Sequence, residues 1–170
     1  MTSQLAIRGA TPEDIPEMLA LIHELAEYER EPESAIATAE DLLRDGFAEP
    51  KRFHALIAEW REGETAEAQA VGLALYFYNY STWRGRAGIY VEDLFVRPMF
   101  RGRGVGKALL RRVAEIAVAE GCARLEWSVL NWNTPAIDFY RALGAEAMSE
   151  WTIMRVAGDA LVKLGTPRTG

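Results

Sequence analysis

One stretch of the sequence decides the fold, residues 91–107, which reads Val91-Glu92-Asp93-Leu94-Phe95-Val96-Arg97-Pro98-Met99-Phe100-Arg101-Gly102-Arg103-Gly104-Val105-Gly106-Lys107. An apolar strand pattern runs to Val96, Pro98 ends it, and a helical pattern begins at Val105. Glycines in between let backbone N–H groups face a ligand, and the helix N-terminus adds partial positive charge. The basic side chains of the loop add full charges. The stretch therefore predicts an anion site suited to phosphate.

Two common phosphate motifs do not fit this loop. A Walker A loop requires G-x-x-x-x-G-K-[ST], but Ala108 follows Gly106-Lys107 and Arg101 stands five positions before Gly106. The dinucleotide fingerprint G-x-G-x-x-G would need a glycine at position 107, where the chain has lysine. The pattern that remains is Arg-x-x-Gly-x-Gly between a strand and a helix.

The rest of the chain predicts alternating strands and helices. Period-2 patterns and turn residues predict strands over residues 4–8, 53–60, 70–78, 89–96 and 123–130, with a last strand or hairpin over 148–156. Apolar spacing and caps predict helices over residues 12–29, 38–46, 105–120 and 133–143. This order indicates one α+β (α/β-like) domain over residues 1–170, with a mixed, mostly antiparallel sheet flanked by helices.

Composition excludes several classes of protein. The chain has 170 residues, of which 49% are hydrophobic, too many for a disordered chain. Its net charge of −6 argues against a nucleic-acid binder, and no apolar run approaches a membrane span. A single cysteine, Cys122, and the absence of a signal pattern predict a reducing, cytoplasmic location. One cysteine and two histidines predict no metal site.

The net charge hides a strong asymmetry along the chain. Residues 13–49 hold twelve acidic and two basic side chains, whereas residues 97–112 hold six basic and no acidic ones. Solvated helix faces explain many such charge runs. The alternative is a basic cradle for an anion and an acidic side that attracts a cation.

At the loop the sequence resembles a known family. Arg101-Gly102-Arg103-Gly104-Val105-Gly106 is similar to the (R/Q)-x-x-G-x-(G/A) pyrophosphate loop of the GNAT N-acetyltransferases. Three further stretches resemble the diamine (spermidine/spermine or thialysine) acetyltransferase subfamily: Tyr90–Val96, Asp41–Phe47 and the Asn133-x-Pro135-Ala136-Ile137-x-Phe139-Tyr140 frame. The similarity extends from about Ile7 to about Val156.

The resemblance implies an enzyme that moves the acetyl group of acetyl-CoA to a primary amine of a small cation, by direct attack in a ternary complex. It also implies splayed strands that form the acetyl-CoA cleft, and a homodimer in which both chains line each site. By the same resemblance the residues that bind acetyl-CoA are Leu94, Phe95, Val96, Arg101, Gly102, Arg103, Gly104, Val105, Gly106, Lys107, Asn133 and Ala136.

The chemistry requires a base and an acid. A primary amine has a pKa near 10.4, so roughly one molecule in a thousand or fewer is neutral at pH 7. Glu92 is the family's candidate base; a solvent-side strand carboxylate is the structural alternative. Tyr140 is the candidate acid that protonates the departing CoA thiolate, and a core tyrosine is its alternative. Because strand side chains alternate, Asp93 is expected to face the other way and to play a structural role.

The amine contacts follow from the resemblance alone. The corresponding substrate-binding residues are Tyr28, Glu29, Trp83, Glu92, Glu126 and Ser128. The chain departs from the family's Tyr-Asp-Pro-Trp, since it reads Tyr80-Ser81-Thr82-Trp83. Ser81 thus replaces an acidic amine contact, which leaves the natural amine open among polyamines, diamines and thialysine-like amino acids.

Two other functions remain open from the sequence. One is a protein or peptide N-acetyltransferase of the same superfamily, although the acidic first helix suits a small polycation better. The other is a non-catalytic module that binds acetyl-CoA, which the presence of both Glu92 and Tyr140 disfavours.

Overall fold

The computed structural model describes residues 3–167. The chain divides into two compact units, residues 1–128 and 129–170. The first unit contains, in chain order, β1 (Ser3–Gly9), α1 (Ile15–Tyr28), α2 (Ala39–Leu42), β2 (His54–Glu62), β3 (Gln69–Ser81), β4 (Arg86–Val96), α3 (Val105–Ala119) and β5 (Leu125–Trp127). The second contains α4 (Thr134–Ala142) and α5 (Gly158–Gly165).

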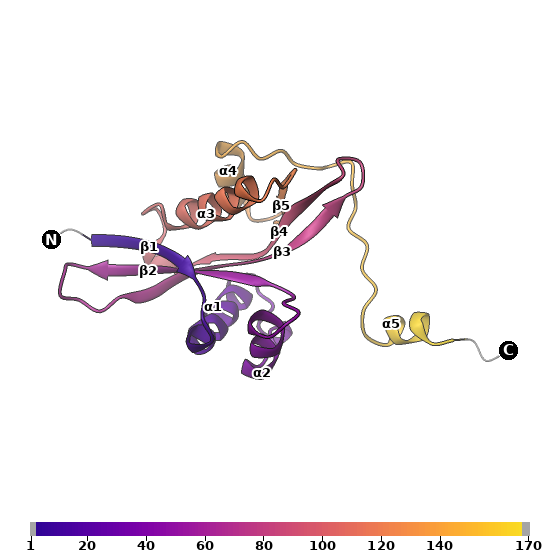
Figure 1. Cartoon of the computed structure of the whole chain (residues 1–170), viewed down its shortest axis with the longest axis horizontal. Coiled ribbons are helices and arrows are strands. Elements are labelled where there is room, and N and C mark those ends of the chain that lie inside the picture. The colour runs from indigo at the N-terminus through magenta and orange to yellow at the C-terminus, as the bar shows by residue number, and fades with distance from the viewer. Residues whose placement is uncertain (1–2, 168–170) are drawn as a thin grey trace. The chain divides into compact units, whose positions relative to one another are not determined.

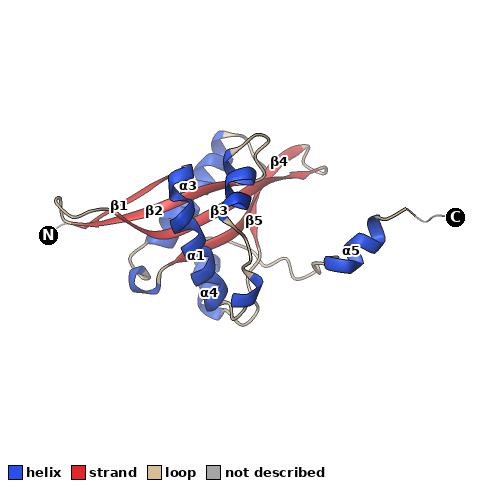
Figure 2. Ribbon diagram, turned by 90° about the horizontal axis from the view of Figure 1, so that it is seen from below, coloured by secondary structure: helices blue, strands red, loops and turns tan. Residues whose placement is uncertain are grey.

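The five strands form one sheet in the order β1-β2-β3-β4-β5 (Figure 1). β1 to β4 pair antiparallel, whereas β5 lies parallel to β4. Two consecutive parallel strands need a long crossover connection, and α3 provides it between β4 and β5. α1 and α2 cover one face of the sheet and α3 the other, as Figure 1 shows edge-on and Figure 2 shows from below. This mixed, mostly antiparallel sheet with helices on both faces confirms the predicted fold class.

α1 begins as its sequence predicts. The N–H of Thr11 donates a hydrogen bond to Oδ2 of Asp14 at 2.8 Å, and Pro12 opens the turn before the helix. The buried residues of α1, Ile15, Met18 and Leu21, recur every three residues and so form one apolar stripe. This stripe joins a core cluster with Leu42, Ile57, Leu73 and Phe95. The cluster fixes α1 and α2 against β2, β3 and β4.

β3 approaches its neighbours closely at Gly72. A Cβ added there would lie 2.9 Å from the backbone oxygen of Phe95 and 3.1 Å from Cδ1 of Leu109. We expect Gly72→Ala to lower the free energy of unfolding by about 1–3 kcal/mol, because a sheet carbonyl cannot move away freely. Urea denaturation measures this loss.

Gly9→Ala is the matched control, since a Cβ at Gly9 meets nothing within 4 Å. We expect a change of about 0.5 kcal/mol or less for that variant. Equal losses in the two variants would contradict the close approach at Gly72.

β4 and β5 separate soon after they meet. They pair only at Ile89–Leu125, Tyr90–Glu126 and Val91–Trp127, while β4 continues to Val96. Within residues 3–167, no strand pairs with the β5 side of β4 beyond Val91. The separation leaves the splayed opening that the predicted fold requires.

The C-terminal part departs from the sequence prediction. The strand expected over residues 123–130 is limited to Leu125–Trp127. The strand or hairpin expected over residues 148–156 is wrong, because the structure has no regular element there, and α5 was missed. Alternating apolar residues favour a strand locally, but a strand forms only where another edge supplies hydrogen-bond partners.

Candidate active site

β4 carries one extra residue opposite β3. Leu75 pairs with Asp93 and the next residue, Tyr76, pairs with Val91, so Glu92 has no partner in the register. Such a β-bulge bends the strand and re-aims its side chains. Glu92 is exposed and follows Val91, the last residue of β4 that pairs with β5. The candidate base therefore lies at the point where the two strands separate.

Asp93, beside the bulge, sits in an unfavourable electrostatic environment. Burial, followed by the negative charges of Glu92 and Glu29, raises the pKa of Asp93 from its ordinary value of 3.8 to about 6. Glu29 caps the C-terminus of α1, and burial raises its pKa as well. These three residues, Glu29, Glu92 and Asp93, form a carboxylate cluster between α1 and β4. A bound cation would relieve their repulsion.

Sequence reasoning did not anticipate that Asp93 lies close enough to Glu92 and Glu29 to feel their charges. Strict alternation along a strand sends adjacent side chains to opposite faces, but the bulge at Glu92 interrupts that alternation. The available signal was the adjacent pair of acidic residues within an otherwise apolar strand.

The glycine loop leads into the N-terminus of α3. Gly102 and Gly104 have φ angles of +73° and +83°, which favour glycine strongly. Gly104 is the N-cap of α3, and no side chain caps this end of the helix. The first N–H groups of a helix have no partners within it. The loop and the first turn of α3, where exposed Lys107 lies, therefore suit a phosphate group.

The two arginines of the loop lie against aromatic rings. Nε of Arg101 donates to the backbone oxygen of Val96 at 2.9 Å, and its guanidinium carbon lies 4.4 Å from the ring centre of Tyr28. The guanidinium of Arg103 lies 5.3 Å from the ring centre of Trp60. Arg101 thus joins a strand residue predicted to bind acetyl-CoA to Tyr28, a predicted amine contact.

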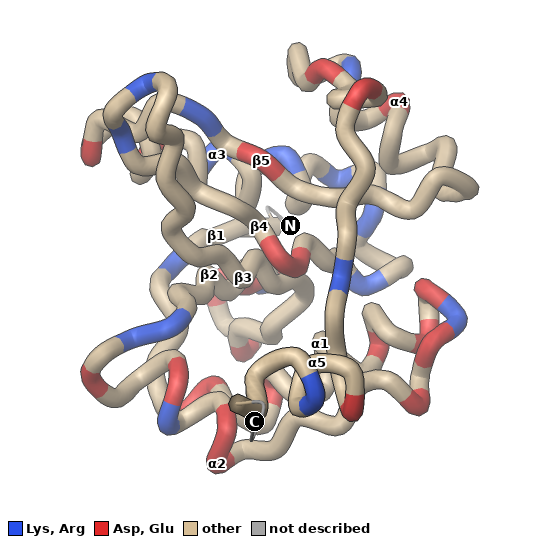
Figure 3. The backbone as a smooth tube through the Cα atoms, turned by 90° about the vertical axis from the view of Figure 1, so that its right-hand side faces the viewer, with Lys and Arg blue, Asp and Glu red and all other residues tan. Residues whose placement is uncertain are grey.

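The acidic and basic segments partly neutralise each other. Acidic residues recur along α1 and α2 (Figure 3), but Arg97 at the end of β4 forms ion pairs with Glu24 at 2.8 Å and with Glu17 at 3.2 Å. The same guanidinium donates to the backbone oxygen of Ala70 at 2.7 Å. These contacts join α1 to the sheet, so part of the predicted charge separation has a structural role.

Trp83 lies far from the carboxylate cluster in this chain. It occupies the turn between β3 and β4 and is 90% exposed. Strands rise about 3.3 Å per residue, so the start of β4 at Arg86 lies about 20 Å from Glu92. Ser81, at the same turn, is buried and its Oγ accepts a hydrogen bond from the N–H of Arg84 at 3.3 Å. The structure does not bring Trp83 together with Glu92.

Glu126 and Ser128 both have side-chain partners. Glu126 accepts a hydrogen bond from Nδ2 of Asn79 at 2.8 Å and pairs with Nε of Arg124 at 2.9 Å. Oγ of Ser128 lies 2.6 Å from the hydroxyl oxygen of Tyr90. These bonds tie the segment around β5 to β3 and β4.

The second unit holds the other predicted site residues. Oδ1 of Asn133 accepts a hydrogen bond from the N–H of Ala136 at 3.4 Å and so caps α4, with Pro135 in the first turn. Tyr140 is half-buried near the end of α4, and its ring centre lies 5.3 Å from that of Phe139. The helix that the sequence predicts here is confirmed.

A match to a protein-family model shows to which family the chain belongs. The model of the acetyltransferase (GNAT) family matches residues 17–145, which include the bulge at Glu92, the glycine loop and Tyr140. The chain belongs to the GNAT acetyltransferase family. The resemblance seen in the sequence is confirmed.

The chain is also similar to individual acetyltransferases and solved structures. This GNAT chain is 42% identical over 163 residues to the thialysine N-epsilon-acetyltransferase of Bos taurus, covering 93% of the chain and 95% of the relative. It is 31% identical over 195 residues to the L-ornithine N5-acetyltransferase of Arabidopsis thaliana, covering 91% and 85%. Among solved structures, it is similar to an integron cassette protein from V. cholerae, with a TM-score of 0.77, 26% identity, and coverage of 96% and 98%.

Among the described helices of this GNAT chain, none is long and apolar enough to cross a membrane. In the same part of the chain, no three His, Cys, Asp or Glu side chains are grouped as a metal-binding set.

Proposed function

We propose that this chain transfers the acetyl group of acetyl-CoA to the side-chain amine of a small basic amino acid, with diamines and polyamines as related substrates. The carboxylate cluster carries this proposal, because burial, together with the charges of Glu92 and Glu29, raises the pKa of Asp93 to about 6, and a bound ammonium group would stabilise the ionised carboxylates. Two relatives are named for thialysine and ornithine, both amino acids with a side-chain amine. Ser81, in place of an acidic contact, also favours a substrate with fewer cationic groups than a polyamine.

The residues present fit acetyl-CoA. The free edge of β4 offers the backbone groups of residues 94–96 to the pantetheine arm, and Gly102–Lys107 offer N–H groups and a helix N-terminus to the pyrophosphate. Asn133 and Ala136 complete the proposed set. When bound, acetyl-CoA supplies a thioester that is activated toward attack by an amine.

Glu92 and Asp93 are proposed to take the proton of the substrate ammonium, directly or through water. A base serves best when its pKa lies near the working pH. The pKa of Asp93, about 6, is closer to neutrality than that of an ordinary aspartate. Asp93 therefore joins Glu92 as a proposed base, and Glu29 with the ring of Tyr28 is proposed to hold the cation.

Tyr140 is proposed to protonate the departing CoA thiolate. A phenol has a pKa near 10 and can donate its proton without being ionised at pH 7. The support is the motif around α4, which the family model covers.

A homodimer is proposed because one chain does not supply the whole predicted amine site. Trp83 lies in the turn before β4, whose start is about 20 Å from Glu92, and its exposed ring is instead proposed to cover the carboxylate cluster of a second copy. Sedimentation velocity tests the dimer, and a purely monomeric, active chain would contradict it.

The two units are proposed to form one acetyltransferase domain, since the family model spans residues on either side of the boundary at residue 128.

A reducing, cytoplasmic location is also proposed, which the single cysteine of the chain supports.

A panel of amines tests the proposed function. Release of CoA thiol from acetyl-CoA is measured with thialysine, ornithine, lysine, spermidine and a peptide with a free N-terminus. We expect the highest kcat/KM with thialysine or ornithine. Turnover of the peptide alone would indicate a protein acetyltransferase, and tight CoA binding without turnover of any amine would indicate a binding module. Either result overturns the proposal.

Arg101→Ala tests the assignment of the glycine loop. We expect the Kd of CoA to rise roughly tenfold, because a charge-assisted contact with phosphate is lost. Calorimetry measures the Kd, and Arg61→Ala, at an exposed position of β2, is the control. If the Kd of CoA is unchanged and only the KM of the amine rises, Arg101 belongs with Tyr28 in the amine site instead.

A further inference from the structure

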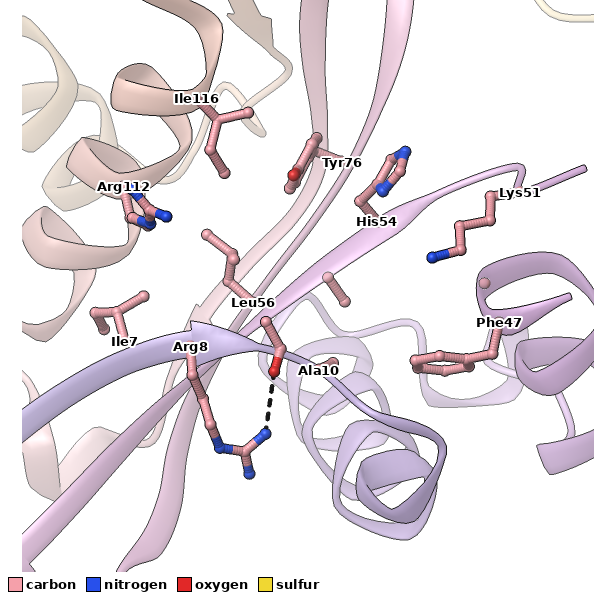
Figure 4. Close-up of a pocket in the computed structure, with 13 residues that line it drawn as sticks. Ile7, Arg8, Ala10, Phe47, Lys51, His54, Leu56, Tyr76, Arg112 and Ile116 are labelled. Carbon is pink, nitrogen blue, oxygen red and sulfur yellow. Dashed lines mark hydrogen bonds between the residues drawn. The ribbon is translucent and has the colours of Figure 1, made fainter. Parts of the chain in front are cut away.

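The first unit contains a cavity of about 340 Å³ between β1, β2 and α3 (Figure 4). It forms where β1 leaves the sheet: Gly9 is the last residue paired with β2, and the chain then turns away after Ala10 bonds to Ala55. The volume lies in the lower range for sites of small molecules.

This cavity is separate from the proposed acetyl-transfer site. α3 contributes Arg112 and Ile116 from its C-terminal half, whereas the glycine loop meets the N-terminus of α3. None of the residues proposed to bind acetyl-CoA or the amine is among those that line the cavity.

The cavity combines an apolar floor with two cationic side chains. Ile7, Leu56 and Ile116 line the floor, and beside them the ring of His54 stacks on that of Tyr76 with centres 5.4 Å apart. Arg112 and Lys51 extend toward the same space from opposite sides (Figure 4). The floor suits a flat or apolar body, and the cations suit acidic groups at its two ends.

The lining carries positive charge although the chain as a whole is acidic. The chain has 25 acidic residues, yet the described residues that line the cavity include none. Arg8 also lines it, but the guanidinium of Arg8 is bound by Asp14 at 2.6 Å and Glu59 at 2.8 Å.

The two inward cations are less strongly paired than Arg8. Arg112 forms an ion pair at 3.3 Å with the exposed Glu115, which also pairs with Arg111. Within residues 3–167, no carboxylate forms an ion pair with Lys51. Burial and the charge of Lys51 lower the pKa of His54, against the smaller opposite effects of Glu120 and Glu49, which do not line the cavity. The charged side chains that line the cavity are therefore all basic, which favours an anion.

We propose that this cavity binds a small organic dianion, with one acidic group held by Lys51, the other by Arg112, and the body packed on Leu56 and Tyr76. Charge-assisted hydrogen bonds to the two cations give orientation, and burial of the body adds affinity. The proposal goes beyond the proposed acetyl transfer and does not depend on it.

Terephthalate, a flat dicarboxylate, is the probe, and amide chemical shifts of the full chain report its binding. We expect saturable shifts confined to residues around 51–56 and 112–116. Lys51→Gln and Arg112→Gln should each weaken binding roughly tenfold, because each removes one charged contact. Arg61→Gln, an exposed charge outside the cavity, should leave binding unchanged, and benzoate should bind more weakly than terephthalate.

Three results would overturn the proposal. One is the absence of saturable shifts up to the solubility limit of the probe. Another is displacement of the probe by CoA, which would place it in the cofactor site. The third is an equal loss in Arg61→Gln, which would indicate general charge attraction. Spectra of the free variants verify that each is folded. The test depends only on binding of the probe, so failure of the proposed acetyl transfer would leave its result unchanged.

Discussion

Tyr140→Phe is expected to lower kcat for acetyl transfer by roughly 10²–10⁴-fold, because the substitution removes only the hydroxyl proposed to protonate the CoA thiolate. The ring of Tyr140 packs beside Phe139, and phenylalanine preserves that packing. The Kd of CoA should therefore stay close to that of the unmodified chain. Thiol-release kinetics and calorimetry measure the two quantities.

Tyr80→Phe is the matched control for this experiment. Tyr80 is 61% exposed on β3 and is not proposed to take part in the site, so loss of its hydroxyl should leave kcat unchanged. Near-normal turnover of Tyr140→Phe would remove Tyr140 from the mechanism. A large fall in both variants would point to a general effect of removing tyrosine hydroxyls.

Asp93→Asn is expected to lower kcat by roughly 10²-fold and to remove one limb of the pH profile. Asp93 must be ionised to take a proton, so the activity of the unmodified chain should fall as the pH drops through about 6. Because the asparagine side chain cannot titrate, the Asp93→Asn variant should lack this limb. The dependence of kcat/KM on pH measures the effect, and Glu92→Gln is compared in parallel. If the limb persists in Asp93→Asn and disappears in Glu92→Gln, Glu92 is the base.

The same substitution is expected to stabilise the fold above pH 6. The folded-state pKa of Asp93, about 6, exceeds its ordinary value of 3.8, so folding disfavours the ionised form. Ionisation of Asp93 in the folded chain therefore lowers the free energy of unfolding. The loss approaches about 3 kcal/mol above pH 6 and vanishes below about pH 4. Urea denaturation at pH 8 should show Asp93→Asn to be the more stable chain, and at pH 4 the difference should be small. A less stable variant at pH 8 would contradict the unfavourable environment of Asp93.

Local signals in the sequence were sufficient for much of the fold. The apolar stripe and the cap at Thr11 placed α1, and glycines at positive φ placed the turn before α3. Each of these features depends on residues within one or two helical turns of each other, so the pattern specifies the structure directly.

Features that depend on a distant neighbour were not predictable in this way. The bulge at Glu92 exists only in the register between β3 and β4. The raised pKa of Asp93 comes mainly from burial in the folded chain and partly from Glu29 at the end of α1. The partners of Arg97, Glu17 and Glu24, likewise come from a helix far away in the sequence. The wrong strand over residues 148–156 has the same cause, because its alternation gives no information about a pairing partner.

For the candidate site, the sequence motifs named residues but did not indicate how those residues are arranged. The loop motif identified the segment whose N–H groups suit a phosphate, but it gave no indication that Arg101 lies on the ring of Tyr28. Trp83 was placed with the amine contacts by resemblance, and the length of β4 separates it from Glu92 within one chain. Motifs identify residue types, whereas distances depend on the lengths of the elements between them.

The bulge in β4 has a consequence for how this strand tolerates change. Val91 pairs with Tyr76 and Asp93 with Leu75, and because Tyr76 and Leu75 are adjacent, the ladder on both sides would stay in register in a strand that lacked Glu92. That residue is surplus to the hydrogen-bonded framework. The sheet can therefore carry different side chains at this one position without repacking its core, which separates the demands of folding from those of the proposed chemistry within a single strand.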